Sequence, residues 1–331
     1  MDSHPYGSLG GHDTEELFIL IYLLVSRYLE CRERQCGPLR RSRNGVLPKF
    51  TDAEVITEVL VCELEQPVSH RAWYHKLRGT WHGLFPNLLS RSRLLRRELA
   101  LAPVIEDFRR KLIEYLYLDE DCERFTDSAP IHLAHAGRAM RNLNKRFRPE
   151  WLKDKHGGTK VEVEPGFADI GRCATKMETY FGMKLFVLIT MGSIPTSWCL
   201  TRASVSDKCD AVLELMQADP YAQRGGCIRV WSDNGFEKQE LNHAAEQMGH
   251  RLFAFPKRRD KDRWPKELRA RIRSLRQAVE SVFSDGVRFL NLEHPHVATL
   301  RGLMTRMTAK ITAMTLYQLK PLLHDLAEGR L

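Results

Sequence analysis

Short apolar runs alternate with helical stretches over the second half of the chain, and this order restricts the possible folds more than any other feature. Apolar segments at 180–191 and 197–202 predict two strands joined by a tight turn. The later elements are a helix at 207–218, a strand at 227–231, a helix at 237–248, a strand at 251–255 and helices over 268–328. Strands that alternate with helices in this way predict an α/β domain.

The first part of the chain has a different pattern, because its apolar residues recur at helical spacing. Thr51 and Glu54 have the spacing of a capping box at the start of a helix, and a later helix is predicted over 94–118. We therefore predict a helical region at 1–119 and an α/β domain at 120–331. Within the second domain, residues 138–176 are basic and without a clear period, which indicates a loop insertion.

The charge of the chain favours a polyanionic partner. Its 51 Lys and Arg residues exceed its 42 Asp and Glu residues, which gives a net charge of +9. Each phosphate that a basic side chain neutralises releases counterions and strengthens binding. A solvated basic surface is the alternative, so charge alone gives nucleic acid only a modest preference.

Cysteine usage and hydropathy indicate a protein of the cytoplasm. The eight cysteines include no Cys-x-x-Cys pair, and several lie in apolar runs, where a free thiol acts as a small hydrophobe. This pattern predicts a reducing compartment and no structural zinc. The longest apolar run, Leu17 to Val25, is far shorter than the roughly 20 residues that span a bilayer, so no membrane segment is expected.

Two aspartates lie where an α/β sheet places its functional groups, at the ends of strands. Asp127 precedes Ser128 and Pro130, which we expect to end a strand at this point. Asp233 follows a short apolar strand, and the next two residues, Asn-Gly, permit a sharp turn with positive φ. The alternative for both is an ordinary turn aspartate.

Glu280 lies in an amphipathic helix. It shares one side of that helix with Arg273 and Arg276, which precede it by seven and four residues. The alternative is a surface Arg–Glu pair of little energy. The functional interpretation is a carboxylate beside guanidinium groups that bind phosphate.

Three carboxylates suit the cleavage of a phosphodiester bond. This reaction needs an activated water or hydroxyl and a stabilised leaving oxygen, and two Mg²⁺ ions held by carboxylate oxygens provide both.

Basic residues near these elements are candidate contacts to phosphate, although each is also compatible with a solvated surface. The candidates are Arg93, Arg96 and Arg97 in the helical region, Lys184 in a strand, Lys257, Arg258 and Arg259 ahead of the last helices, and Arg273 and Arg276 beside Glu280.

Four motifs occur in a fixed order, and together they resemble those of the DDE transposases of bacterial insertion sequences. They are Asp127-Ser-x-Pro, Gly182-x-Lys184, Ser232-Asp233-x-Gly and Arg276-x3-Glu280. The resemblance covers roughly residues 48–325. It implies an RNase H-like core, which is a mixed five-stranded sheet with flanking helices, preceded by an all-helical region that binds DNA.

The resemblance also implies the activity and the partners. Asp127, Asp233 and Glu280 are expected to hold two Mg²⁺ ions, with Mn²⁺ as a substitute. The expected substrates are the double-stranded terminal repeats of the element and a target DNA, cleaved and joined by a homodimer. Two alternatives stay open: a nuclease of the same fold that does not join strands, and a catalytically silent descendant that only binds DNA.

Overall fold

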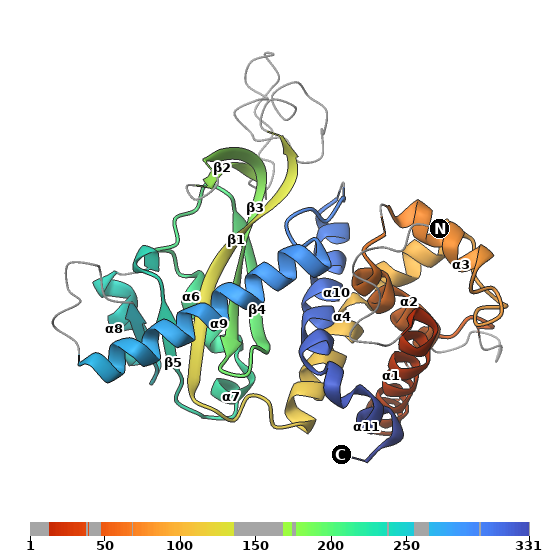
Figure 1. Cartoon of the computed structure of the whole chain (residues 1–331), viewed down its shortest axis with the longest axis horizontal. Coiled ribbons are helices and arrows are strands. Elements are labelled where there is room, and N and C mark those ends of the chain that lie inside the picture. Colours follow the sequence, from red (N-terminus) through yellow and green to blue (C-terminus); the bar gives the residue numbers. More distant parts are fainter. Residues whose placement is uncertain are drawn as a thin grey trace. The chain divides into compact units, whose positions relative to one another are not determined.

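The computed structural model describes residues 13–37, 39, 48–67, 69–135, 168–173, 177–236, 238–254, 265–297 and 299–330. The chain forms two compact units. Unit 1 comprises residues 1–111 together with 304–331, and unit 2 comprises residues 112–303. In the described part of the chain, the strands all belong to unit 2, whereas unit 1 is helical (Figure 1).

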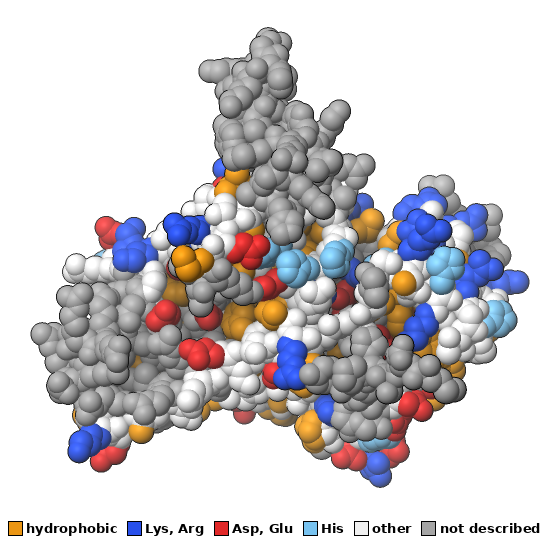
Figure 2. Space-filling view, turned by 45° about the horizontal axis from the view of Figure 1, so that its top comes forward, with side chains coloured by type: hydrophobic (Ala, Val, Ile, Leu, Met, Phe, Trp, Pro, Cys, Tyr) orange, Lys and Arg blue, Asp and Glu red, His pale blue; other side chains and the backbone are white. Residues whose placement is uncertain are grey.

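The helices of unit 1 follow the predicted pattern. They are α1 (Thr14–Cys36), α2 (Asp52–Glu65), α3 (His70–Gly79), most of α4 (Arg91–Tyr115), most of α10 (Leu300–Gln318) and α11 (Leu323–Glu328), with a 3-10 turn at Lys320–Leu322. The capping box is confirmed, because Thr51 Oγ1 accepts from Glu54 N at 3.1 Å and Glu54 Oε2 accepts from Thr51 N at 2.6 Å. Charged side chains of both signs lie on the described surface of the molecule (Figure 2).

The C-terminal helices belong to unit 1, which corrects the predicted division between residues 119 and 120. Glu63 of α2 is buried and accepts from Arg306 Nη1 at 2.6 Å and from Lys310 Nζ at 2.7 Å, both in α10. Every side chain from Met307 to Leu316 is buried. A helix that is covered on all sides needs neighbours around its whole circumference. The segment from 304 to 331 therefore completes the interior of unit 1 rather than that of the α/β domain.

Unit 2 contains a mixed sheet of six strands, one more than predicted. The strands are β1 (Glu123–His135), β2 (Asp169–Cys173), β3 (Glu178–Thr190), β4 (Pro195–Arg202), β5 (Arg229–Ser232) and β6 (Arg251–Ala254). Their order is β2-β3-β1-β5-β6, with β4 paired to another part of β3. β1, β2 and β4 run antiparallel to β3, whereas β5 is parallel to both β1 and β6. The additional strand, β2, lies in the segment predicted as a loop insertion, whose remainder is largely outside the described residues.

The first strand is longer than predicted, since β1 continues through Ser128 and Pro130 to His135. Its neighbour β5 pairs with it only as far as Thr126. Beyond Thr126, β1 has no pairing with β5, so this side of β1 is an edge. Pro130 is tolerated there because an edge position does not require a backbone N–H donor. The strand also bulges between His132 and Ala134.

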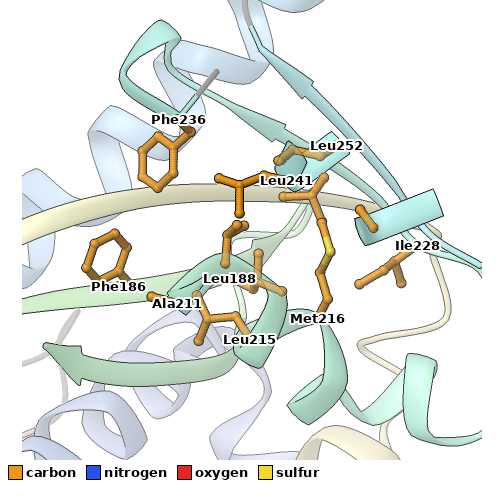
Figure 3. Packing of buried hydrophobic residues seen from close by; sticks show 12 residues of the cluster. Phe186, Leu188, Ala211, Leu215, Met216, Ile228, Phe236, Leu241 and Leu252 are labelled. Atoms are coloured by element: carbon orange, nitrogen blue, oxygen red, sulfur yellow. The ribbon is translucent and has the colours of Figure 1, made fainter. Parts of the chain in front are cut away.

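Helices cover both faces of the sheet. On one face, α6 (Ala211–Ala218) and α8 (Gln239–Gln247) bury an apolar cluster against β3 and β5 (Figure 3). The cluster includes Phe186, Leu188, Val212, Leu215, Met216, Val230, Phe236 and Leu241. The short α7 (Pro220–Gln223) follows α6, and α9 (Lys266–Leu290) crosses the other face and contacts β1 (Figure 1). Among the described residues, no helix has the length and hydropathy needed to span a membrane.

Candidate active site

Asp127 and Asp233 leave two neighbouring strands at the same level. The last residues paired between the parallel strands β1 and β5 are Thr126 and Ser232, and the two aspartates follow them directly. Neighbouring strands are about 4.8 Å apart, and residues at the same level of the pleat point to the same face. The register therefore places Asp127 and Asp233 next to each other at the ends of this strand pairing, on the face that α9 crosses.

The turn after Asp233 is anchored by an aromatic side chain. Residues Asn234–Phe236 form a turn of 3-10 helix, in which Phe236 N donates to Asp233 O at 3.0 Å. The Phe236 ring is buried and packs edge-on against Phe186, with 5.9 Å between the ring centroids. Gly235 does not adopt the positive φ that the Asn-Gly sequence permits. Burial of Phe236, rather than an unusual backbone, holds the Asp233 side chain at the strand end.

The Asp127 carboxylate is oriented by its own neighbour. Ser128 N donates to Asp127 Oδ1 at 2.7 Å, and the Asp127 side chain is partly buried. A hydrogen bond from a backbone N–H to an ionised carboxylate is among the stronger protein hydrogen bonds. It fixes the direction in which Asp127 presents its oxygens.

A further carboxylate, Asp207, lies on the other face of β1. Its Oδ1 accepts from Ser128 Oγ and from Lys184 Nζ, both at 3.0 Å. Lys184 Nζ also donates to Val205 O at 2.7 Å. A Cβ placed on Gly235 would lie 3.5 Å from Asp207 Oδ2, so the second oxygen faces the turn that follows Asp233. Asp207 thus connects the residue after Asp127, a neighbouring strand and the Asp233 turn.

These bonds change the interpretation of Lys184. The side chain was predicted to contact phosphate, but the structure gives it Asp207 and Val205 as partners, on the face of the sheet opposite the two aspartates. Its strand is positioned by Gly182, where a Cβ would lie 1.9 Å from Ile131 O at the bulge of β1. Only glycine fits this close approach of the two backbones.

Glu280 lies on α9, the helix that contacts β1. It is exposed in α9, near the buried Val282 and Phe283. Within the described parts of the chain, no group of three His, Cys, Asp or Glu side chains is arranged to hold a metal ion. The structure therefore shows a pair of carboxylates on one face and a third on a helix that crosses that face.

The pair nevertheless fits Mg²⁺. This ion prefers hard oxygen ligands, retains several water molecules, and is typically bound by one or two carboxylates together with the phosphates of a substrate. Asp127 and Asp233 supply two such carboxylates from rigid strand ends. A site completed by substrate oxygens does not require a third protein ligand in the absence of substrate.

Apart from Lys184, the predicted phosphate contacts fall into three groups. Arg93 and Arg96 are exposed on α4, as a surface contact requires. Arg97 is buried and donates to Asp52 Oδ1 and to Phe50 O, so it stabilises the start of α2 and its predicted DNA contact is corrected. The other five candidates are not described: Lys257, Arg258 and Arg259 lie outside the described residues, and so do the side chains of Arg273 and Arg276.

Comparison with known proteins gives distant structural similarities. No protein-family model and no curated protein matches the sequence. Over 97% of its length the chain is similar to 80% of a chain in a piggyBac transposase synaptic complex with hairpin DNA, with 10% identity and a TM-score of 0.41. It is also similar to a pre-cleavage Mos1 transpososome, with 11% identity, 88% of this chain and 86% of that chain covered, and a TM-score of 0.24. TM-scores this low carry no argument about function, which must come from the site.

Proposed function

We propose that the chain is a DNA transposase of the DDE type, from a bacterial insertion sequence, which cleaves and joins DNA at the ends of the element. Its proposed metal ligands are Asp127, Asp233 and Glu280, and its proposed cofactor is a pair of Mg²⁺ ions, for which Mn²⁺ substitutes. The proposed partners are double-stranded terminal repeats, a target DNA and a second copy of the chain.

One observation carries this proposal: two aspartates follow neighbouring parallel strands in register, on the face that is crossed by the helix with Glu280. The order of elements supports it as well. An antiparallel group of strands precedes two parallel strands that alternate with helices, which is the arrangement expected of an RNase H-like core.

The residues of the chain have defined tasks in this reaction. When bound, two Mg²⁺ ions supply the activation of the attacking water or 3′-hydroxyl and the stabilisation of the leaving oxygen. Asp127 and Asp233 would hold these ions through their anionic oxygens, and the Ser128 N–H fixes the orientation of Asp127. The first attack breaks a phosphodiester bond and leaves a 3′-hydroxyl at the end of the element. That hydroxyl then attacks the target phosphodiester, so one bond forms as another breaks.

The test is an assay for cleavage and joining with labelled DNA that carries the ends flanking this gene, in Mg²⁺ and in EDTA. We expect Mg²⁺-dependent products in which the labelled end is joined to target DNA. Cleavage without joined products would identify a nuclease instead. Binding without either product would identify a catalytically silent DNA-binding protein.

Substitution of Asp207 tests whether its bonds support the site. We expect Asp207→Asn to lower the rate of joining about tenfold, the lower end of the range for groups that orient metal ligands. The matched control is Asp210→Asn, because Asp210 is exposed in the same loop and makes no side-chain cap bond to α6. Equal joining rates in the two variants would show that Asp207 does not support the site. Thermal unfolding of both variants distinguishes a lower joining rate from a loss of stability.

A further inference from the structure

A stretch of unit 1 carries positive charge without any acidic residue. Between Gln66 and Arg97 the sequence contains no Asp or Glu but seven Lys and Arg residues, although acidic residues are frequent in the chain as a whole. This stretch comprises the α2–α3 connection, α3, the α3–α4 connection and the start of α4. Lys and Arg side chains lie close together over the region of α3 (Figure 2). Local charge of one sign favours a polyanion at this surface.

One face of α3 is firmly attached to unit 1. Trp73 and Leu77 are buried, and Trp73 Nε1 donates to Glu58 Oε1 of α2 at 2.8 Å. The Trp73 ring also stacks on Phe18 of α1, with 6.0 Å between centroids. At the start of the helix, Ser69 Oγ accepts from Ala72 N at 3.1 Å. These contacts hold α3 in one orientation, which a recognition surface requires.

The opposite face of α3 is exposed and basic. Arg71, His75 and Arg78 are exposed at i, i+4 and i+7, so they form one stripe along the helix. Ala72 and Gly79, which are also exposed, add little bulk beside this stripe. Long basic side chains flanked by small residues let a helix backbone approach a polyanion closely.

The arginines of this stripe have no acidic partners among the described residues. Arg71 and Arg78 make no ion pair there, and neither does Arg93 at the start of α4. Lys76, by contrast, lies on the edge of the stripe and pairs with Glu65 at 3.2 Å. A solvated helix surface normally mixes charges of both signs, whereas this one leaves its guanidinium groups available for phosphates.

The connection to α2 favours duplex DNA as the polyanion. Residues 66–69 join α2 to α3, which is the connection length of a helix-turn-helix. The major groove of B-form DNA admits an α-helix, whereas that of an RNA duplex is too narrow. We propose that α3, with Arg71, His75 and Arg78 facing outward, is the element that docks on double-stranded DNA, and that Arg91, Arg93 and Arg96 extend its contact to the phosphates. The choice of DNA as the partner rests on the proposed function.

The test measures binding of a fluorescent DNA duplex by anisotropy in EDTA at several salt concentrations, so that no catalysis contributes. The variant is Arg71→Ala with Arg78→Ala. We expect the slope of log K against log salt to fall by about 2, because each lost phosphate contact removes about 0.9. The control is Arg34→Ala with Arg330→Ala, which removes the same charge from exposed sites elsewhere in unit 1 and should leave the slope unchanged.

Each outcome decides the proposal. An unchanged slope in the α3 variant would overturn it, as would an equal loss in the control or equally tight binding of an RNA duplex. Absence of DNA binding by the wild type would end both this proposal and the proposed function. If the wild type binds DNA through α3 but forms no joined product, only the proposed function is contradicted.

Discussion

Replacement of Asp233 by Asn is expected to lower strand joining by about 10³-fold, the loss typical of removing one group that stabilises developing charge. Asn has the shape of Asp but lacks the anionic charge that a divalent cation requires. The position tolerates the change structurally, because Asp233 is exposed and the turn is anchored by the buried Phe236. The measurement is the yield of joined product from labelled ends in Mg²⁺.

Two controls distinguish a loss of catalytic activity from a loss of folded structure. Thermal unfolding of Asp233→Asn should match that of the wild type, and its binding of duplex DNA in EDTA should be unchanged, since α3 belongs to unit 1. Joining at the wild-type rate in this variant would contradict the metal-ligand assignment. The proposed function would then have to be abandoned, because the register of Asp127 and Asp233 is the observation on which it depends.

Replacement of Asp219 by Ala is expected to have the largest effect on stability. Arg124 and Asp219 are both fully buried, and they are joined by two hydrogen bonds, Nε to Oδ2 at 2.8 Å and Nη2 to Oδ1 at 3.3 Å. Without Asp219, the buried Arg124 guanidinium keeps, among the described residues, only the partly exposed Asp121 as an acidic partner, at 3.0 Å. We therefore expect a cost of about 3 kcal/mol, the lower end of the range for breaking a buried ion pair. For a unit of this size that cost corresponds to a midpoint of unfolding about 10 °C lower.

Thermal unfolding followed by circular dichroism measures this effect. The matched control is Asp325→Ala, which breaks an exposed ion pair with Arg330 and should change the midpoint by less than about 3 °C. If the buried charge of Arg124 causes the loss, removing both charges should cost less than removing one. Asp219→Leu combined with Arg124→Met should therefore be more stable than Asp219→Ala alone. A midpoint for Asp219→Ala equal to that of the wild type would refute the assigned role of the pair.

Local features of the fold were predictable because they depend on residues close in sequence. Periodicity indicated the helices of unit 1 and the strands β3 to β6, and Thr51 with Glu54 marked the start of α2. The two aspartates were found in the same way, since each follows a segment of apolar residues. These signals arise from backbone preferences and from the burial of one face.

Features that depend on distant residues were missed. The ion pair of Arg124 with Asp219 and the bonds of Asp207 each join segments far apart in sequence. The hydrophobic periodicity of the sequence does not indicate such pairings, because they depend on how strands and helices pack together. Arg97 shows the same limit: its neighbours suggest a basic surface patch, yet Asp52 and Phe50 draw it into the interior.

The discontinuous course of unit 1 sets an order for folding on the ribosome. Domains generally fold as units while the chain is being synthesised. Unit 2 is complete in sequence at residue 303, whereas unit 1 lacks the partners of Glu63 until Arg306 and Lys310 have been made. The α/β unit can therefore acquire its structure first, and the unit that carries α3 is finished only after Arg306 and Lys310 have been made. In a nascent chain, the unit with Asp127 and Asp233 can thus fold before the unit with the proposed DNA-binding helix is complete.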